Sequence, residues 1–148
     1  MKRMKEMICT AIGAAGGAVA AALGGWDAAL ATLLIFMAVD YISGLIVAGV
    51  FHNSKKTESG TLESRAGWKG LCRKSVTLPF VLVAHRLDLV IGVNYMRDAV
   101  IIGFIANELI SIVENAGLMG VPLSPMIQNA IDILTKKSEE KTGEKDGE

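Results

Sequence analysis

The stretch that most constrains how this chain can fold is residues 97–121, RDAVIIGFIANELISIVENAGLMGV. Its length suits a bilayer crossing, which takes about 20 apolar residues, but its composition does not, because polar residues interrupt it. On a helix of about 3.6 residues per turn these polar residues share one face, and aliphatic residues cover the rest. The members of this polar stripe are Asn107, Glu108, Ser111, Glu114 and Asn115.

The polar stripe makes this helix only marginally stable in a membrane by itself. Each strongly hydrophobic residue contributes about 0.3–0.6 kcal/mol to insertion, whereas one carboxylate near the middle costs about 2.5–3.5 kcal/mol. The polar face must therefore be met by other helices, by copies of the same helix, or by water in a pore.

The overall composition favours a small membrane protein. Of the 148 residues, 51% are hydrophobic and the formal net charge is zero, while the mean hydropathy is +0.43. This is too apolar for a soluble helical bundle with a solvated outer face. The charges gather in residues 2–6, 55–74 and 136–148, and His52 and His85 are isolated. We therefore expect no metal site, no cofactor and no catalytic residue, so the chain is not predicted to be an enzyme.

Four apolar blocks predict an all-α integral membrane protein with three to four transmembrane helices. The expected spans lie near residues 8–25, 28–51, 76–92 and 98–121. They form one transmembrane domain over residues 1–135, followed by a charged, disordered cytoplasmic tail over 136–148. Three spans with an external N-terminus fit the charge pattern as well as four spans with both ends inside.

The first block is built from alanine and glycine. Gly13 and Gly17 belong to a ridge of small residues at every fourth position, which lets helices pack closely in lipid. The basic residues before this block also resemble the start of a cleaved secretory signal. We favour a retained helix, because the next apolar block begins at once.

Two charged residues inside the apolar blocks are candidates for packing or pairing. Asp40 lies near the middle of the second block, where an acid normally faces the protein interior or a wet cavity. It is either functional or a structural hydrogen-bonding group between helices. Arg86 in the third block either extends outward to the interface or pairs with a carboxylate, for which Asp40 and Glu108 are candidates.

Residues 52–74 form a basic segment that sets the expected topology. The positive-inside rule places this segment and the C-terminus in the cytoplasm, with the segment lying as a loop on anionic lipid headgroups. Apart from Trp68, it lacks the interleaved aromatic residues typical of nucleic-acid binding, so no nucleic-acid partner is expected. Its basic residues are Lys55, Lys56, Arg65, Lys69, Arg73 and Lys74.

Three motifs in this order resemble the toxin-secretion and phage-lysis holins of Gram-positive bacteria and their prophages. They are DYISG at residues 40–44, the pattern S-x-x-G-x-x-G-L-x-R-K at residues 64–74, and NELISIVENAGLMGVPLSP at residues 107–125. The resemblance implies a multi-pass protein of the bacterial cytoplasmic membrane that forms homo-oligomers. Such a protein opens lesions that release an endolysin or a toxin and so times host lysis. The partners implied are other copies of the chain and the bilayer, without direct binding to the endolysin.

Under this resemblance, the polar stripe would line or seal the lesion, and Asp40 would support helix contacts. Two other classes compete. A small proton-coupled or multidrug transporter would use Asp40 or Glu108 as a titrating group, but it would need a defined midplane pocket. A small membrane lipid kinase is disfavoured, because Glu108 and Glu114 lie about 9 Å apart along a helix, too far to share one magnesium ion.

The N-terminus also suggests a timing device. Met1 and Met4 flank Lys2 and Arg3, and holins of other families use two such starts, the longer product delaying the shorter. Each charge moved across the membrane potential costs about 2.3 kcal/mol per 100 mV, so the two extra charges would hold the longer N-terminus inside. Alternatively, the basic residues only orient the first span.

Overall fold

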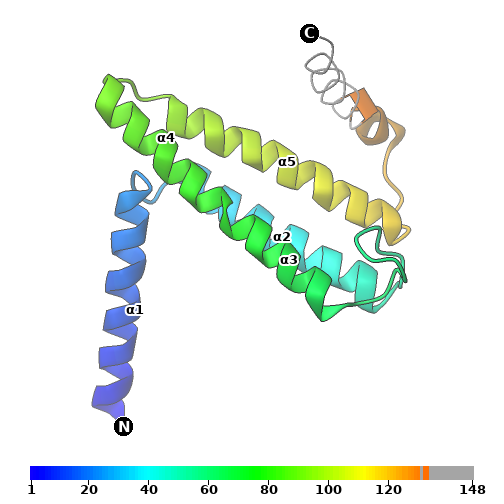
Figure 1. The fold of residues 1–148 in the computed structure, drawn as a ribbon, viewed down its shortest axis with the longest axis horizontal. Coiled ribbons are helices and arrows are strands. Elements are labelled where there is room, and N and C mark those ends of the chain that lie inside the picture. Colours follow the sequence, from blue (N-terminus) through cyan, green and yellow to red (C-terminus); the bar gives the residue numbers. More distant parts are fainter. Residues whose placement is uncertain (131, 134–148) are drawn as a thin grey trace.

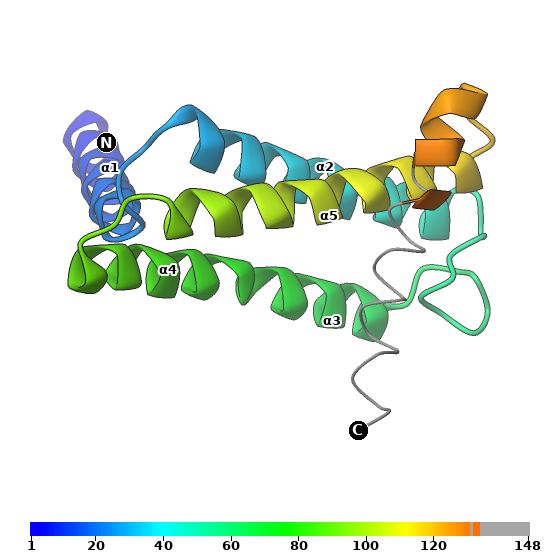
Figure 2. The same cartoon turned by 90° about the horizontal axis from the view of Figure 1, so that it is seen from above.

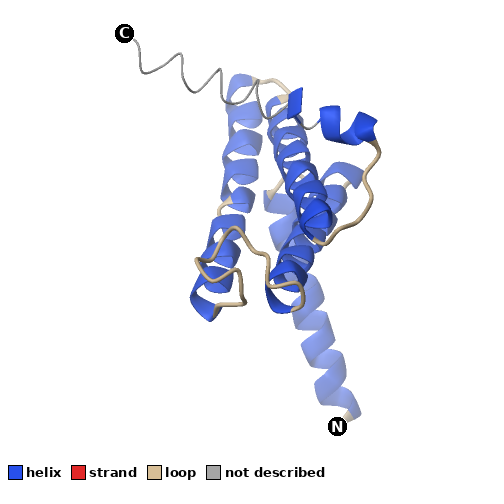
Figure 3. Cartoon of the chain, turned by 90° about the vertical axis from the view of Figure 1, so that its right-hand side faces the viewer, coloured by secondary structure: helices blue, strands red, loops and turns tan. Residues whose placement is uncertain are grey.

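The structure, a computed structural model, describes residues 1–130, 132 and 133. Its long helices are α1 (Lys2–Ala22), α2 (Ala28–Gly49), α3 (Ser64–Ser75), α4 (Thr77–Ile91) and α5 (Met96–Leu118). Every regular element in these residues is helical (Figure 3), which confirms the all-α prediction. The predicted tail, residues 136–148, lies outside the described residues.

Helices α2, α4 and α5 pack side by side, and α3 continues the line of α4 (Figures 1 and 2). The bundle is held by a small apolar core of buried side chains. On the α4–α5 contact, the rings of Phe80 and Phe104 meet with their centroids 6.0 Å apart. The core residues are Leu23, Leu30, Leu33, Val81 and Ile101.

The ends of the helices follow from local sequence. The Asp27 carboxylate accepts a hydrogen bond of 2.8 Å from the Leu30 amide, which begins α2. Helix α4 ends at Gly92, whose φ of +78° is left-handed and suits glycine. At the opposite end of the bundle, the Asn53 side chain donates to the Leu118 carbonyl at 3.3 Å and joins the α2–α3 loop to the end of α5.

Helix α3 corrects the expectation that residues 52–74 form a loop throughout. Only Val76 separates it from α4. Glycines let α3 approach α2: a Cβ at Gly67 would lie 3.8 Å from the Tyr41 hydroxyl, and one at Gly70 would lie 4.0 Å from its ring. The loop proper is therefore confined to the residues before Ser64.

Helix α1 leaves the bundle and contributes no buried residue (Figure 1). Within the described part of the chain, nothing lies within 4 Å of a Cβ built at Gly13 or Gly17. The predicted close packing along this ridge is therefore not made with the other described helices. Contact with another copy stays a prediction.

Two of the described helices, α2 and α5, are long and apolar enough to cross a membrane. Helix α4 has 15 residues, fewer than a span needs by itself. The expected spans near residues 8–25 and 76–92 thus correspond to helices in the structure, but their membrane crossing stays a prediction.

Candidate functional site

Two buried acids on different helices share one lysine at the centre of the bundle. The Lys74 ammonium of α3 lies 2.5 Å from the Asp40 carboxylate of α2 and also pairs with the Glu108 carboxylate of α5. Asp40 is 3% exposed and Glu108 is 5% exposed. A single cation thus joins three helices through charged groups that are largely removed from solvent.

Asn115 extends this network along α5. Its side-chain amide donates to the Asp40 carboxylate at 2.9 Å and to the Ser43 hydroxyl at 2.8 Å. Glu108 and Asn115 are seven residues apart, so two helical turns bring both onto the face that meets α2. We call Asp40, Ser43, Lys74, Glu108 and Asn115 the central network.

The predicted polar stripe of α5 extends from the central network into an open cleft. Glu108 and Asn115 are buried in the central network. Glu108 also lines a cleft of about 980 Å³ between α3 and α5, together with Asn107, Ser111 and Glu114. The stripe is thus partly sealed by other helices and partly accessible.

Of the two alternatives for Arg86, pairing with Asp40 or Glu108 is not made among the described residues, and the exposed side chain agrees with outward extension. Arg86 is exposed on α4, and the cation that meets both Asp40 and Glu108 is Lys74. The sequence pattern places Lys74 only in the basic, topology-setting segment.

The spacing of the residues that follow Lys74 indicates that its side chain faces the bundle. Starting at Lys74, the positions spaced alternately three and four residues apart all face the bundle, which is the period of a packed helix. Those that follow are buried: Thr77, Val81, Ala84 and Asp88.

The other basic residues of that segment lie near the cleft or in the loop. Lys55 is exposed in the α2–α3 loop. Lys56 lines the cleft from this loop, and α3 presents Arg65, Lys69 and Arg73 to it. None of these five residues makes an ion pair with another described residue.

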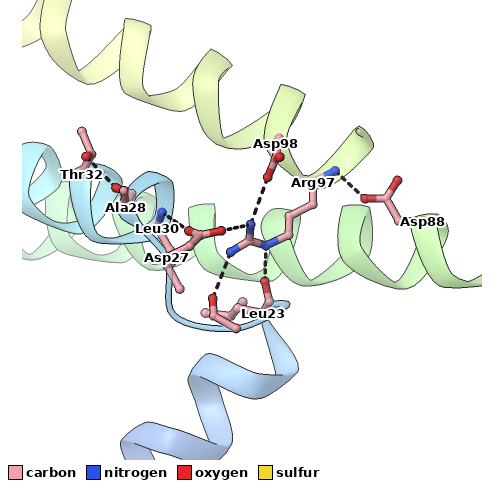
Figure 4. A network of polar contacts seen from close by, with 9 residues as sticks. Leu23, Asp27, Ala28, Leu30, Thr32, Asp88, Arg97 and Asp98 are labelled. Carbon is pink, nitrogen blue, oxygen red and sulfur yellow. Dashed lines mark hydrogen bonds and ion pairs between the residues drawn. The ribbon is translucent and has the colours of Figure 1, made fainter. Parts of the chain in front are cut away.

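A second network, centred on Arg97, joins the C-terminal end of α1 to the N-terminal end of α5 (Figure 4). The guanidinium donates to the Leu23 carbonyl at 2.5 Å and to the Gly25 carbonyl at 3.1 Å. It also pairs with the Asp27 carboxylate at 2.6 Å and the Asp98 carboxylate at 3.0 Å. The Arg97 guanidinium, helped by the Leu30 amide, holds the pKa of Asp27 below its usual value.

Asp88 completes this second network by capping the next helix. Its buried carboxylate, on α4, accepts hydrogen bonds from the backbone amides of Met96 at 3.0 Å and Arg97 at 2.9 Å. These amides begin α5, where an acceptor satisfies otherwise unpaired donors. Neither this helix cap nor the contacts of Arg97 were predicted from the sequence.

The geometry offers ion pairing and hydrogen bonding between the helices of the bundle. Among the described residues, no three His, Cys, Asp or Glu side chains gather where they could hold a metal ion. What the site can do is hold polar faces of three helices together, or release them.

The family model described as the bacteriophage holin family matches residues 17–136. The chain belongs to this family. The resemblance drawn from the three sequence motifs is thereby confirmed, and the match includes α2 to α5 with both networks. Most of α1 lies before the matched region.

Relatives support the same family. An uncharacterised protein of Listeria innocua is 41% identical over 123 residues, covering 81% of this chain and 82% of its own length. A protein named "Probable holin" from Bacillus phage phi105 is 31% identical, covering 77% of this chain and 78% of its own length. An uncharacterised 14.9 kDa protein of Clostridium perfringens is 35% identical over 116 residues. No solved structure matches the chain.

Proposed function

We propose that this chain is a holin of the bacterial cytoplasmic membrane, which accumulates and then oligomerises into lesions that release an endolysin or a toxin. The observation that carries the proposal is the central network, in which Lys74 and Asp40 cover the buried part of the polar face of α5. A helix with such a face has two favourable states in a membrane, one packed against other helices and one facing water.

In the packed state, the central network keeps Glu108 and Asn115 away from lipid. In the lesion, the whole polar stripe of α5 would face water, with Asn107, Ser111 and Glu114 beside Glu108. Neighbouring copies would then contact the apolar faces of the helices, and the polar stripe would stay open to water. The basic segment and the C-terminus would lie in the cytoplasm, in agreement with the positive-inside rule.

The function is tested by inducible expression in bacteria, with and without a co-expressed cytoplasmic endolysin. We expect a sudden fall in optical density when both are present, and loss of membrane potential without rapid clearing when the endolysin is absent. Membrane-inserted protein that never releases the endolysin would contradict the proposal. Proton flux or drug efflux without lysis would favour a transporter instead.

Glu108→Gln should delay lysis. In this variant Asp40 is the only acid that pairs with Lys74, so the central network has no net charge. This favours the packed state over the state in which the polar face of α5 meets water. Glu114→Gln should have a smaller effect, because Glu114 is exposed to the cleft. Lysis time is measured at equal protein levels, with Glu58→Gln in the loop as the control. Unchanged timing for Glu108→Gln would mean that the stripe is only structural.

Leu109→Glu should lower the amount of protein inserted in the membrane. Leu109 is 47% exposed on the outer surface of α5, and a charge there would face lipid at a cost of about 2.5–3.5 kcal/mol. Quantifying the protein in carbonate-washed membranes measures the effect. Asn107→Glu adds the same charge on the polar face and should insert nearly normally. Equal insertion of the two variants would contradict the proposed orientation of α5.

A further inference from the structure

The cleft between α3 and α5 contains more positive charge than the central network uses. Four basic side chains at the cleft are exposed, whereas the exposed acids lining it are Glu63 and Glu114. Lys74, which also lines the cleft, is already paired with two buried acids. The exposed basic residues are Lys56, Arg65, Lys69 and Arg73.

Three of these basic residues lie on one side of α3, along the cleft. Arg65, Lys69 and Arg73 are spaced four residues apart, so they project from the same side of α3. The described residues give none of them an anionic partner within ion-pair distance. The Glu63 carboxylate accepts a hydrogen bond from the Ser59 hydroxyl at 3.0 Å and so has a partner in its own loop.

The surroundings of the cleft favour a lipid over a soluble anion. Phe104 and Ile110 form part of its wall. Beside it, α3 and α4 expose large apolar side chains, including Trp68 at 68% and Phe80 at 55%. An amphipathic ligand matches both features, with its phosphate at the basic residues and its acyl chains along α4. The two exposed acids disfavour a multiply charged soluble anion, but a phosphodiester carries a single negative charge.

We propose that this cleft binds the phosphodiester headgroup of an anionic phospholipid of the phosphatidylglycerol class. Basic pockets between membrane helices on the cytoplasmic side are suited to such headgroups. The proposal rests on the cytoplasmic placement of the α2–α3 loop given above. It adds a defined lipid site to the proposed function, and its test does not depend on lysis.

The test uses the full-length protein in phosphatidylcholine vesicles containing trace spin-labelled lipid. Electron paramagnetic resonance gives the association of spin-labelled phosphatidylglycerol relative to spin-labelled phosphatidylcholine. We expect a preference of about fivefold for phosphatidylglycerol, the effect of about one well-placed basic contact. The triple variant Arg65→Gln, Lys69→Gln, Arg73→Gln should lose this preference.

A matched variant removes three positive charges at the start of α1, far from the cleft, through Lys2→Gln, Arg3→Gln and Lys5→Gln. It should keep the preference, so an equal loss in both triple variants would overturn the proposal in favour of general surface charge. The double variant Glu63→Gln, Glu114→Gln removes the two exposed acids of the cleft and should increase the preference for phosphatidylglycerol. It tests the site while keeping all of its basic residues. An unchanged preference in this variant and in the cleft variant would also overturn it.

Inorganic phosphate, added at constant ionic strength, distinguishes the two sources of a phosphate group. It should leave the preference for phosphatidylglycerol unchanged. Abolition of the preference by inorganic phosphate would assign the cleft to a free anion instead of a lipid.

Discussion

Replacing Lys74 with methionine should lower the free energy of unfolding by about 3–5 kcal/mol, because two buried carboxylates lose the cation they share. Methionine keeps a flexible apolar stem of similar length, so the loss reports mainly on charge. Asp40 and Glu108 are 3% and 5% exposed, so neither carboxylate is well hydrated in the packed state. Titration of detergent-solubilised protein with dodecyl sulfate, followed by circular dichroism, measures the change.

Two further variants show whether charge or packing causes the loss of stability in Lys74→Met. Lys55→Met removes a lysine from the exposed loop and should change stability by less than about 0.5 kcal/mol. Adding Asp40→Asn and Glu108→Gln to Lys74→Met should restore most of the lost stability, because neutral side chains can replace a buried ion pair at little cost. If the triple variant were as unstable as Lys74→Met, packing rather than charge would be responsible.

The same substitution connects stability to the proposed function. Loss of Lys74 penalises only the packed state, because water can solvate both carboxylates in a lesion. A penalty of 3–5 kcal/mol corresponds to a shift of more than about a hundredfold toward the wet state. We therefore expect Lys74→Met to lyse cells early at equal membrane levels, in contrast to the delay expected for Glu108→Gln.

The sequence predicted the helices better than the contacts between them. Periodicity and length located α2 and α5 to within a few residues, and helical spacing placed Glu108 and Asn115 on one face. It could not show that this face extends from the central network into the cleft. Both features depend on α3, and the high charge of residues 52–74 predicted a loop there instead of a helix.

Lys74 was missed because charge and helical period gave conflicting indications. As one of six basic residues it satisfied the positive-inside rule, and that rule does not specify whether a lysine is in water or in a bundle. Its spacing with Thr77 and Val81 favoured an inward-facing position. In a membrane protein, a lysine at the inward-facing position next to an apolar block should be tested as a partner for intramembrane acids.

The network around Arg97 was missed for a different reason. Arg97 contacts residues of the α1–α2 turn that are more than 70 positions away, and no local pattern indicates which turns of a bundle meet. Gly24 shows how closely they approach: its φ is +94°, and a Cβ there would lie 2.6 Å from the Arg97 Nε atom. The sequence shows two adjacent glycines, Gly24 and Gly25, but nothing in it indicates the side chain that they meet.

Arg97→Leu should release α1 from the bundle and lower the free energy of unfolding by about 2–4 kcal/mol. The variant loses hydrogen bonds from a charged donor to two backbone carbonyls, and these contribute most of the loss. The ion pairs with Asp27 and Asp98 contribute less, because those side chains are 47% and 56% exposed. The chain's two cysteines suit the measurement, since Cys9 on α1 and Cys72 on α3 are both exposed. Spin labels on this natural pair should give a broader distance distribution in Arg97→Leu than in the unsubstituted protein.

Arg86→Leu is the matched control, because it removes an exposed arginine near the same end of the bundle and should leave the distance distribution unchanged. Gly24→Ala approaches the same contact from the other partner: the added methyl group must displace the Arg97 side chain, and the left-handed backbone disfavours any side chain there. It should broaden the distribution as Arg97→Leu does. A narrow distribution in both Arg97→Leu and Gly24→Ala would show that α1 is positioned by something other than the Arg97 network.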